Sequence, residues 1–169
     1  MGSSRLIRSV VLFVCVFAVL QLTWQSLRGS AVERFVIHDM TLVPAAGLAN
    51  RVTPGVGARA EGSRLTSARG GINILNGCEG MDAMLLLVAA FAAAPLAWRS
   101  RLAGAGVGTV VVFAINQARI LVLFYAYRSS PHLFDALHAF VTPIAVVLLV
   151  AMYFHVWLTV GFGRPPAPA

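Results

Sequence analysis

The hydrophobic residues of this chain are gathered in four long blocks separated by more polar stretches. Each block approaches the roughly 20 residues that an α-helix needs to cross the hydrocarbon core of a bilayer. The blocks run from about Leu6 to Leu22, from Met81 to Ala97, from Gly104 to Tyr127 and from Leu137 to Val160. This pattern predicts an all-α polytopic membrane protein with about four transmembrane helices.

The first block also has the charged start and apolar centre of a signal peptide. Its end, from Gln21 to Gln25, offers no small-x-small cleavage site, and Trp24 suits an anchor at the membrane interface. We therefore interpret this block as a retained transmembrane helix.

The stretch between the first and second blocks is more polar and carries six arginines. Five apolar residues within it recur at helical spacing and predict an outward-facing amphipathic helix that lies in the membrane interface. We expect Pro44 to end or kink this helix, because proline lacks a backbone N–H group. Further on, Leu65, Ile72 and Ile74 indicate a small hairpin. The five residues of the helical pattern are Val32, Phe35, Val36, Met40 and Val43.

The pattern divides the chain into four segments. Residues 1–27 hold the first transmembrane helix and its flanks, and residues 28–77 form the amphipathic and loop segment outside the cytoplasm. Residues 78–160 form a three-helix membrane core that carries the candidate catalytic chemistry. Residues 161–169 contain three prolines and are expected to form a disordered cytoplasmic tail.

The composition agrees with a membrane protein. Hydrophobic residues make up 59% of the 169 residues and charged residues only 11%, against about 25% in soluble domains. All 13 basic residues are arginine, and the net charge is +7. No basic stripe with interleaved aromatic residues is present, so we assign this charge to membrane topology and to membrane lipids as partners. Nucleic-acid binding is not expected.

Arginines near the ends of the blocks set the expected orientation, because short cytoplasmic segments are enriched in basic residues. With four spans, residues 28–77 and 128–136 face outward, and both chain termini are cytoplasmic. The six arginines of residues 28–77 oppose this orientation, but that segment is close to the length at which the rule weakens. The arginines that fall together on the cytoplasmic side are Arg5, Arg8, Arg99, Arg101 and Arg164.

Cys78 stands out among the reactive residue types because residues 76–80 form a polar, glycine-flanked stretch, Asn-Gly-Cys-Glu-Gly. Flanking glycines allow close approach of a substrate backbone. We expect the thiol at the outer start of a helix, where the helix N-terminus lowers a thiol pKa toward the reactive thiolate. Cys15 lies inside the first apolar block, and we interpret it as a small buried apolar residue.

Topology brings further polar side chains to the same outer side. Arg119 falls in the outer half of the third span, where a charge costs about 2.5–3.5 kcal/mol on insertion scales. Asn116 stands one turn earlier on the same face, so both are expected to point into the helix bundle. His138 opens the fourth span, and His132 in the preceding turn is the competing histidine. His155 lies deep in the fourth span toward the cytoplasm.

The ordered set of Asn-Gly-Cys-Glu-Gly, then Asn-x-x-Arg in a following span, then Phe-x-x-x-His opening another span, resembles the exosortase/archaeosortase family. The resemblance covers roughly Gly71 to Trp157. The chain is similar to the compact bacterial exosortases, which have a histidine where the archaeal branch has another arginine. The resemblance implies a catalytic set of Cys78, Arg119 and His138.

The resemblance also implies an activity and its setting. Family members act on exported proteins with a C-terminal sorting tail, which has a short motif, a transmembrane stretch and a basic end. The protein is expected to be a multi-pass enzyme of the bacterial cytoplasmic (inner) membrane, with its active site facing the periplasm or exterior. It would cleave the tail as a cysteine peptidase and pass the protein to an acceptor as a transpeptidase. No cofactor and no metal ion are expected.

In the expected mechanism, Cys78 attacks a peptide carbonyl and forms a thioester. Arg119 stabilises the thiolate or the developing oxyanion, and His138 serves as general acid and base. Glu79 and Asp82 are further candidates, but acidic residues near a helix N-terminus are also favoured for simple dipole reasons. The supporting or substrate-binding residues are expected to be Asn116, Gly77, Glu79 and Gly80.

Three other functions fit parts of the pattern. A non-enzymatic membrane assembly or chaperone subunit for the export of surface material would use Arg119 and Asn116 to hold helices together, and it would tolerate replacement of Cys78. A redox or metal protein would need more ligands than Cys78 and His138. A transporter would be expected to have a pair of broken apolar helices, which the pattern lacks.

Overall fold

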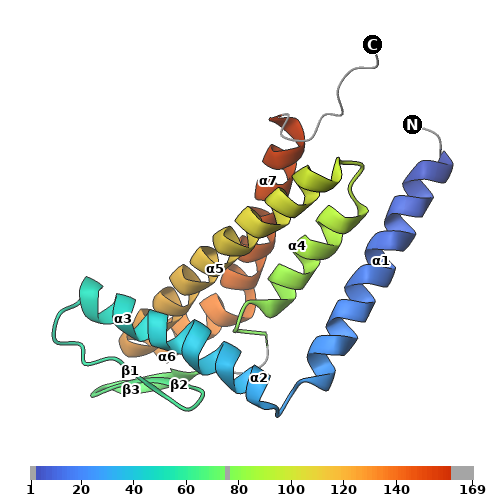
Figure 1. Ribbon diagram of the computed structural model, residues 1–169. Coiled ribbons are helices and arrows are strands. Elements are labelled where there is room, and N and C mark those ends of the chain that lie inside the picture. Colours follow the sequence, from blue (N-terminus) through green and yellow to red (C-terminus); the bar gives the residue numbers. More distant parts are fainter. Residues whose placement is uncertain (1–2, 75–76, 161–169) are drawn as a thin grey trace. The chain divides into compact units, whose positions relative to one another are not determined.

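The computed structural model describes residues 3–74 and 77–160, which are mainly helical. Asn76 and the predicted disordered tail, residues 161–169, lie outside the described residues. The chain forms two compact units, and the helices α5 (Trp98–Ser129) and α7 (Thr142–Thr159) contribute to both (Figure 1). The first unit comprises Met1–Ser26, Asp82–Val112 and Val147–Ala169, and the second comprises Leu27–Met81 and Phe113–Val146.

Among the residues that the structure describes, three helical stretches are long and apolar enough to cross a membrane, which confirms the predicted all-α membrane fold. They are Leu6–Ser26 within helix α1 (Ser3–Ser26), Trp98–Ser129, and Pro131–Thr159. The second predicted span is shorter, because helix α4 (Met81–Ala93) has 13 residues against the roughly 20 needed for a full crossing. The four-span topology therefore stays a prediction.

Helix α4 ends before the apolar block does, because of Pro95 and Arg101. The residues after Ala93 form bends, and Pro95 has no N–H group to continue a helix. The guanidinium of Arg101 donates hydrogen bonds to the carbonyl oxygens of Leu96 and Ala92 at 2.9 and 3.0 Å. A cation at this place satisfies carbonyl groups near the helix end and complements the helix dipole.

Aromatic rings and a glycine pack the helices of the first unit together. The ring of Phe91 in α4 meets the rings of Tyr153, Phe154 and Trp157 in α7, at centroid distances between 5.0 and 6.2 Å. Gly104 of α5 lies directly against this cluster, since a Cβ atom there would collide with the Phe91 ring. Its carbonyl oxygen accepts a hydrogen bond of 2.8 Å from the hydroxyl of Tyr153.

In the second unit, helical structure continues from residue 31 to residue 52. It consists of α2 (Ala31–Arg34), the π-helix η1 (Phe35–Leu42) and α3 (Val43–Val52). Pro44 does not end this helical run as expected but lies in the first turn of α3. The N–H of Val43 bonds to the carbonyl of His38, five residues back, so the π-helix takes up the irregularity that proline imposes.

The same arrangement recurs before Pro143. Helix α6 (Pro131–Ala136) leads into the π-helix η2 (Leu137–Val141), and α7 begins at Thr142. The N–H of Thr142 bonds to the carbonyl of Leu137, again five residues back. Short π-helical segments are frequent at functional sites, and this one contains His138.

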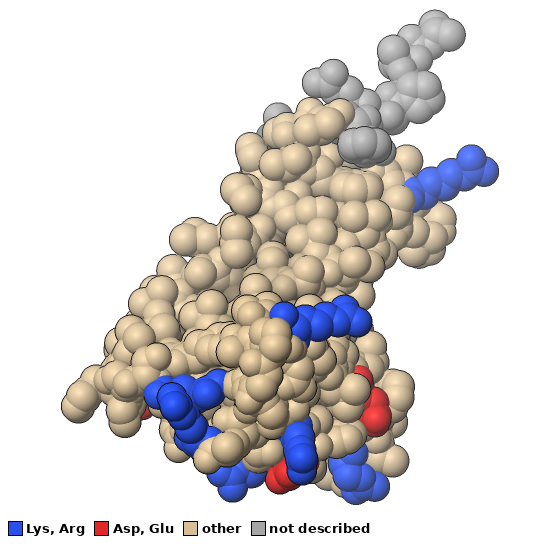
Figure 2. All heavy atoms as spheres, turned by 90° about the vertical axis from the view of Figure 1, so that its left-hand side faces the viewer, with Lys and Arg blue, Asp and Glu red and all other residues tan. Residues whose placement is uncertain are grey.

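The predicted hairpin is present as β2 (Arg64–Ser67) and β3 (Gly70–Asn73), and β1 (Arg59–Glu61) extends it to a three-stranded antiparallel sheet. Leu65 pairs with Ile72, and both side chains are buried in the core of the second unit. On the face shown in Figure 2, arginine side chains with a few acidic ones gather over the sheet and the neighbouring helical run. Charges of this kind protect a sheet edge from pairing with another chain.

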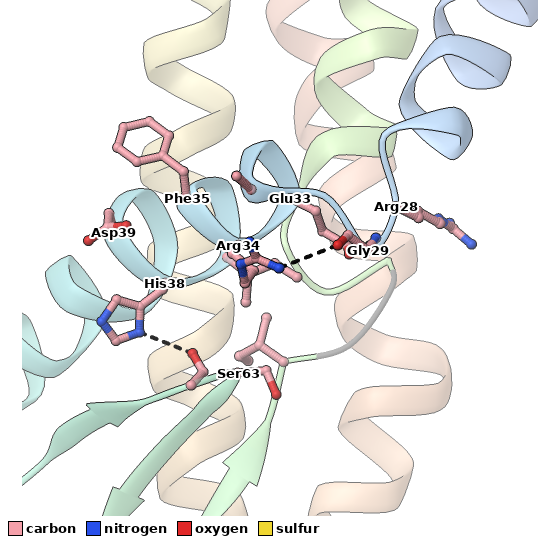
Figure 3. A pocket seen from close by; sticks show the side chains of 12 residues that line it. Arg28, Gly29, Glu33, Arg34, Phe35, His38, Asp39 and Ser63 are labelled. Carbon is pink, nitrogen blue, oxygen red and sulfur yellow. Dashed lines mark hydrogen bonds between the residues drawn. The ribbon is translucent and has the colours of Figure 1, made fainter.

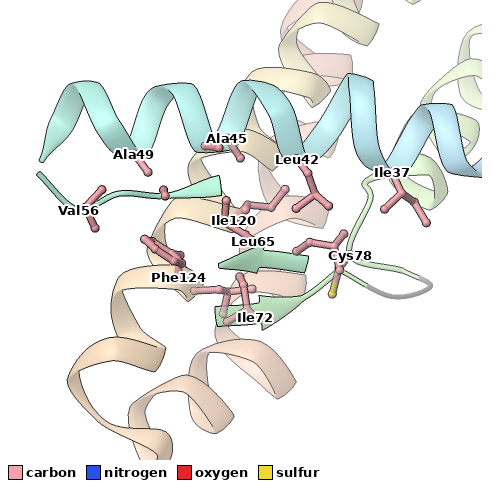
Figure 4. Packing of buried hydrophobic residues seen from close by; sticks show 14 residues of the cluster. Ile37, Leu42, Ala45, Ala49, Val56, Leu65, Ile72, Cys78, Ile120 and Phe124 are labelled. Carbon is pink, nitrogen blue, oxygen red and sulfur yellow. The ribbon is translucent and has the colours of Figure 1, made fainter. Parts of the chain in front are cut away.

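The helical run of residues 31–52 carries apolar residues on two faces. One face, with Ile37, Leu42 and Ala45, is buried against the sheet and α5 (Figure 4). The apolar residues from which the helix was predicted lie mainly on the other face, where their side chains are between 46% and 54% exposed. An exposed apolar face suits a membrane interface, and that placement stays a prediction. These exposed residues are Val32, Phe35, Met40 and Val43.

Candidate active site

Cys78 lies in the short connection between strand β3 and helix α4, outside the membrane-spanning helices. Two glycines with left-handed backbone flank it, Gly77 with φ 90° and Gly80 with φ 84°. Residues with a side chain rarely adopt this conformation, so the glycines permit the tight turn that carries the thiol. Cys78 is buried, with 7% of its surface exposed, and belongs to the core cluster of the second unit (Figure 4).

His138 is brought to the thiol by the π-helix η2. Its Nδ1 atom lies 3.9 Å from Sγ of Cys78, which is a long hydrogen bond to sulfur. The ring of Phe134, one turn earlier, stacks on the imidazole with an interplanar angle of 6° and a centroid distance of 5.3 Å. This stacking limits rotation of the imidazole and keeps its edge toward the thiol.

Arg119 reaches the same thiol from helix α5. Its Nη2 atom lies 3.9 Å from Sγ of Cys78, and its Nη1 atom donates to the carbonyl oxygen of Gly77 at 3.2 Å. The Nε atom donates to the hydroxyl of Thr142 at 3.2 Å. Because the guanidinium is planar, these three bonds fix both its position and its plane.

Asn116, one turn before Arg119 on α5, bonds to the next carbonyl group of the turn. Its Nδ2 atom donates to the carbonyl oxygen of Cys78 at 3.2 Å. A Cβ atom on Gly80 would lie 2.8 Å from the Cγ atom of Asn116, so the glycine is needed for this approach as well as for its backbone conformation. Asn116 is only 3% exposed, and its Oδ1 atom has no hydrogen-bond partner among the described residues.

Burial raises the pKa of the Cys78 thiol above its ordinary value, and this effect outweighs the opposing charge of Arg119. The carboxylate of Glu79 adds to the rise, because a nearby negative charge disfavours the thiolate. The expectation that a helix N-terminus lowers this pKa was therefore wrong in direction. Cys78 lies before the first residue of α4 and in a buried turn, where loss of hydration dominates.

The structure thus brings Cys78, Arg119, His138 and Asn116 into one cluster of the second unit. His132, the competing histidine, is exposed in α6 and makes no hydrogen bond or ring contact with this cluster among the described residues. Asp82 is engaged elsewhere, since it accepts a hydrogen bond of 3.0 Å from Gln21.

Cys15 is exposed on α1, so the interpretation of a buried residue was wrong. Its side chain lies on a helix whose spanning window is 0% buried, and it therefore faces the surroundings of the protein rather than its core. Both cysteines are free. Among the described residues, no group of three or more His, Cys, Asp and Glu side chains is placed to hold a metal ion.

Sequence reasoning missed two buried polar residues near the site. One is Thr142, whose hydroxyl accepts a hydrogen bond from Arg119. Its position one helical turn after His138 and directly before a proline was the sequence signal that could have identified it. Gln117 donates from Nε2 to the carbonyl oxygen of Thr41 at 3.3 Å and so ties η1 to α5. It follows Asn116 directly, but adjacent helical residues do not share a face, and its partner could not be inferred.

Comparison with protein families gives a match over most of the chain. The family model for transmembrane exosortases matches residues 40–157, and this range includes the whole cluster around Cys78. No curated protein and no solved structure matches the chain.

The rate of alkylation of Cys78 by iodoacetamide should keep rising as the pH is increased above about 8.5, the pKa of an unperturbed thiol, because only the thiolate reacts. A Cys15→Ser background leaves a single thiol to follow. Arg119→Gln should raise the midpoint pH of the rate curve further, because the arginine charge lowers the thiol pKa. Glu79→Gln should lower that midpoint, because the carboxylate raises the thiol pKa. A midpoint below about pH 7.5, in the range of activated thiols, would contradict the buried, protonated resting state.

Proposed function

The chain belongs to the transmembrane exosortase family, and on that premise we propose that it is a membrane cysteine transpeptidase that removes the C-terminal sorting tail of exported proteins. The observation that carries this proposal is the approach of two different side chains to one thiol. Nδ1 of His138 and Nη2 of Arg119 each lie 3.9 Å from Sγ of Cys78. A base and a cation beside a buried nucleophile form an arrangement suited to acyl transfer.

The raised pKa of Cys78 supports His138 as the acceptor in the first proton transfer. Because the resting group is a thiol, His138 has to accept its proton as Sγ attacks the substrate carbonyl carbon. This requires the tautomer in which Nδ1 is unprotonated. The contact of 3.9 Å has to shorten for the transfer, as is common when a substrate closes an active site.

The rest of the cycle follows from the same three groups. The tetrahedral intermediate carries negative charge on the former carbonyl oxygen, which Arg119 stabilises. The intermediate collapses when the C–N bond breaks, and His138 gives its proton to the leaving amine of the tail. A thioester then joins Cys78 to the protein. An acceptor amine or water, losing its proton to His138, attacks the thioester, and Cys78 leaves and regains the proton.

The supporting residues keep this geometry. Asn116 and Arg119 bond to successive carbonyl groups, those of Cys78 and Gly77, and so hold the turn at two points. Gly77 and Gly80 permit the backbone turn that carries the thiol, and the missing side chain at Gly80 lets Asn116 approach that turn. Glu79 influences the thiol through its charge.

The membrane setting suits this reaction. A sorting tail with a transmembrane stretch reaches the enzyme by lateral diffusion in the bilayer. We place the enzyme in the bacterial inner membrane with Cys78 at the outer face, in line with the arginines near the ends of the apolar blocks. At that face the thiol meets the junction between the tail motif and its apolar stretch.

Cys78→Ala and Cys78→Ser should each leave an exported, tail-bearing protein unprocessed, with tail removal reduced by at least about 10³-fold, because the covalent step is lost. Loss of the tail is followed by mass on gels or by spectrometry in cells that express enzyme and substrate together. Cys15→Ala is the matched control and should process normally. Normal processing by Cys78→Ala would favour the assembly or chaperone subunit, in which Arg119 serves only to hold segments together.

His138→Ala should lower the rate of tail removal by about 10²–10⁴-fold, because proton transfer to and from the thiol and the leaving amine is lost. His132→Ala is the control, since that side chain is exposed and six residues away. The same cell-based assay reports both variants. Loss of processing only with His132→Ala would overturn the assignment of the general acid and base.

A further inference from the structure

The hydroxyl of Thr142 differs from those of the other threonines in the helices that the structure describes. The other hydroxyls each donate to a carbonyl oxygen four or five residues back in their own helical segment, a common local bond of threonine in helices. The Thr142 hydroxyl instead accepts a hydrogen bond of 3.2 Å from Nε of Arg119 in α5. It is therefore used between helices rather than within one. The threonines with the local bond are Thr23, Thr41, Thr109 and Thr159.

Thr142 lies at the junction between the π-helix η2 and α7, one turn after His138. It is 8% exposed, and its N–H bonds to the carbonyl of Leu137. Residues four apart on a helix lie on the same side, so this junction directs two side chains toward the cluster. The imidazole of His138 approaches the thiol of Cys78, and the hydroxyl of Thr142 approaches Arg119. The start of α7 thus supplies both the candidate base and an acceptor for the cation.

The nitrogen that Thr142 holds is the one nearest the aliphatic part of the arginine side chain. A hydrogen bond at Nε fixes the plane of the guanidinium and occupies neither of its two outer nitrogens. Those outer nitrogens serve the nucleophile, since Nη1 donates to the carbonyl oxygen of Gly77 at 3.2 Å and Nη2 lies 3.9 Å from Sγ of Cys78. Thr142 can therefore orient the cation without competing for the groups that act on the thiol.

Arg34 shows how an arginine of the same unit is held without such an acceptor. It is exposed on α2, and among the described residues its guanidinium has one hydrogen bond, 3.4 Å from Nη1 to the carbonyl oxygen of Gly29 (Figure 3). Holding a long side chain in one rotamer costs entropy, which its contacts have to offset. Without the Thr142 hydroxyl, Arg119 would keep only the bond to Gly77 and the long contact with Sγ of Cys78.

We propose that Thr142 is a positioning residue, whose hydroxyl keeps the guanidinium of Arg119 in the orientation that stabilises the Cys78 thiolate and the oxyanion. The part of this inference that concerns the oxyanion rests on the proposed function, and the part that concerns the thiolate does not. The charged and titratable groups near the thiol are Arg119 of α5, His138 of η2 and Glu79 of its own turn. Of these three, Arg119 is the one that Thr142 contacts by a hydrogen bond.

The pH profile of iodoacetamide alkylation tests the effect on the thiol, in the full-length Cys15→Ser protein in lipid nanodiscs. Thr142→Val keeps the shape of the side chain and removes the acceptor. It should raise the midpoint pH by about half a unit, a fraction of the roughly 1–3 units by which a nearby opposite charge lowers a pKa. Thr142→Ser keeps the hydroxyl and should retain the parent midpoint. Thr159→Val is the matched control on the same helix and should change nothing, because that hydroxyl bonds within its own helix.

A double-mutant cycle separates positioning of Arg119 from a purely structural role of Thr142. In the Arg119→Gln background, Thr142→Val should raise the midpoint no further, because the charge that it orients is already gone. An equal rise in both backgrounds, or a parent-like midpoint for Thr142→Val alone, would overturn the proposal. Thr142→Ala, which also lacks the hydroxyl, carries the same expectations and replaces Thr142→Val if that variant does not fold.

Kinetics of tail removal test the effect on the reaction. Thr142→Val should lower kcat about tenfold and leave KM unchanged, because a well-oriented cation acts mainly on the transition state, and Thr142→Ser should restore kcat. A raised alkylation midpoint with unchanged kcat would overturn the role in the reaction. The two failures are distinguishable. If Cys78→Ala processes substrate normally, the proposed function is wrong, and the alkylation profile still decides whether Thr142 orients Arg119 against the thiol.

Discussion

The guanidinium of Arg119 is the group on which the rest of the site depends. It places a permanent positive charge within a helix that is long and apolar enough to cross a membrane, which is costly unless the charge is hydrogen-bonded. Its three nitrogen atoms contact the carbonyl of Gly77, the thiol of Cys78 and the hydroxyl of Thr142. These contacts offset the cost of burying the charge. They also attach the turn that carries Cys78, and the start of α7, to α5.

Two prolines shape elements that are hydrogen-bonded to α5. Pro44 and Pro143 each follow a π-helix, and in each case an N–H bonds to a carbonyl five residues back. In the first case the irregular segment includes Thr41, whose carbonyl accepts a hydrogen bond from α5. In the second it includes His138, which the altered helical turn presents to the thiol. The first irregular segment thus helps to attach η1 to α5, and the second helps to bring His138 to the nucleophile.

Apolar block lengths predicted the three long apolar helices of the described residues, whereas the second block holds the shorter helix α4. The polar residues of the site were recognisable because each interrupts an apolar or glycine-rich context; they are Cys78, Asn116, Arg119 and His138. The early end of α4 depended on contacts of Arg101 with carbonyl groups, and the continuation of helix past Pro44 depended on π-helical bonding. Neither of these two features can be read from the spacing of apolar residues in the sequence. The direction of the Cys78 pKa shift could not be predicted either, because it depends on how deeply the turn is buried.

The central claim is that Cys78 forms a thioester with the protein it cleaves. The most direct test is intact-mass analysis of the purified enzyme after brief exposure to a tail-bearing substrate without acceptor, followed by fragmentation to locate the adduct. The account predicts an adduct on Cys78 with the mass of the substrate up to the cleaved bond, released by hydroxylamine as thioesters are. Continued tail removal with no adduct on Cys78 under these conditions, or an adduct on another residue, would contradict it.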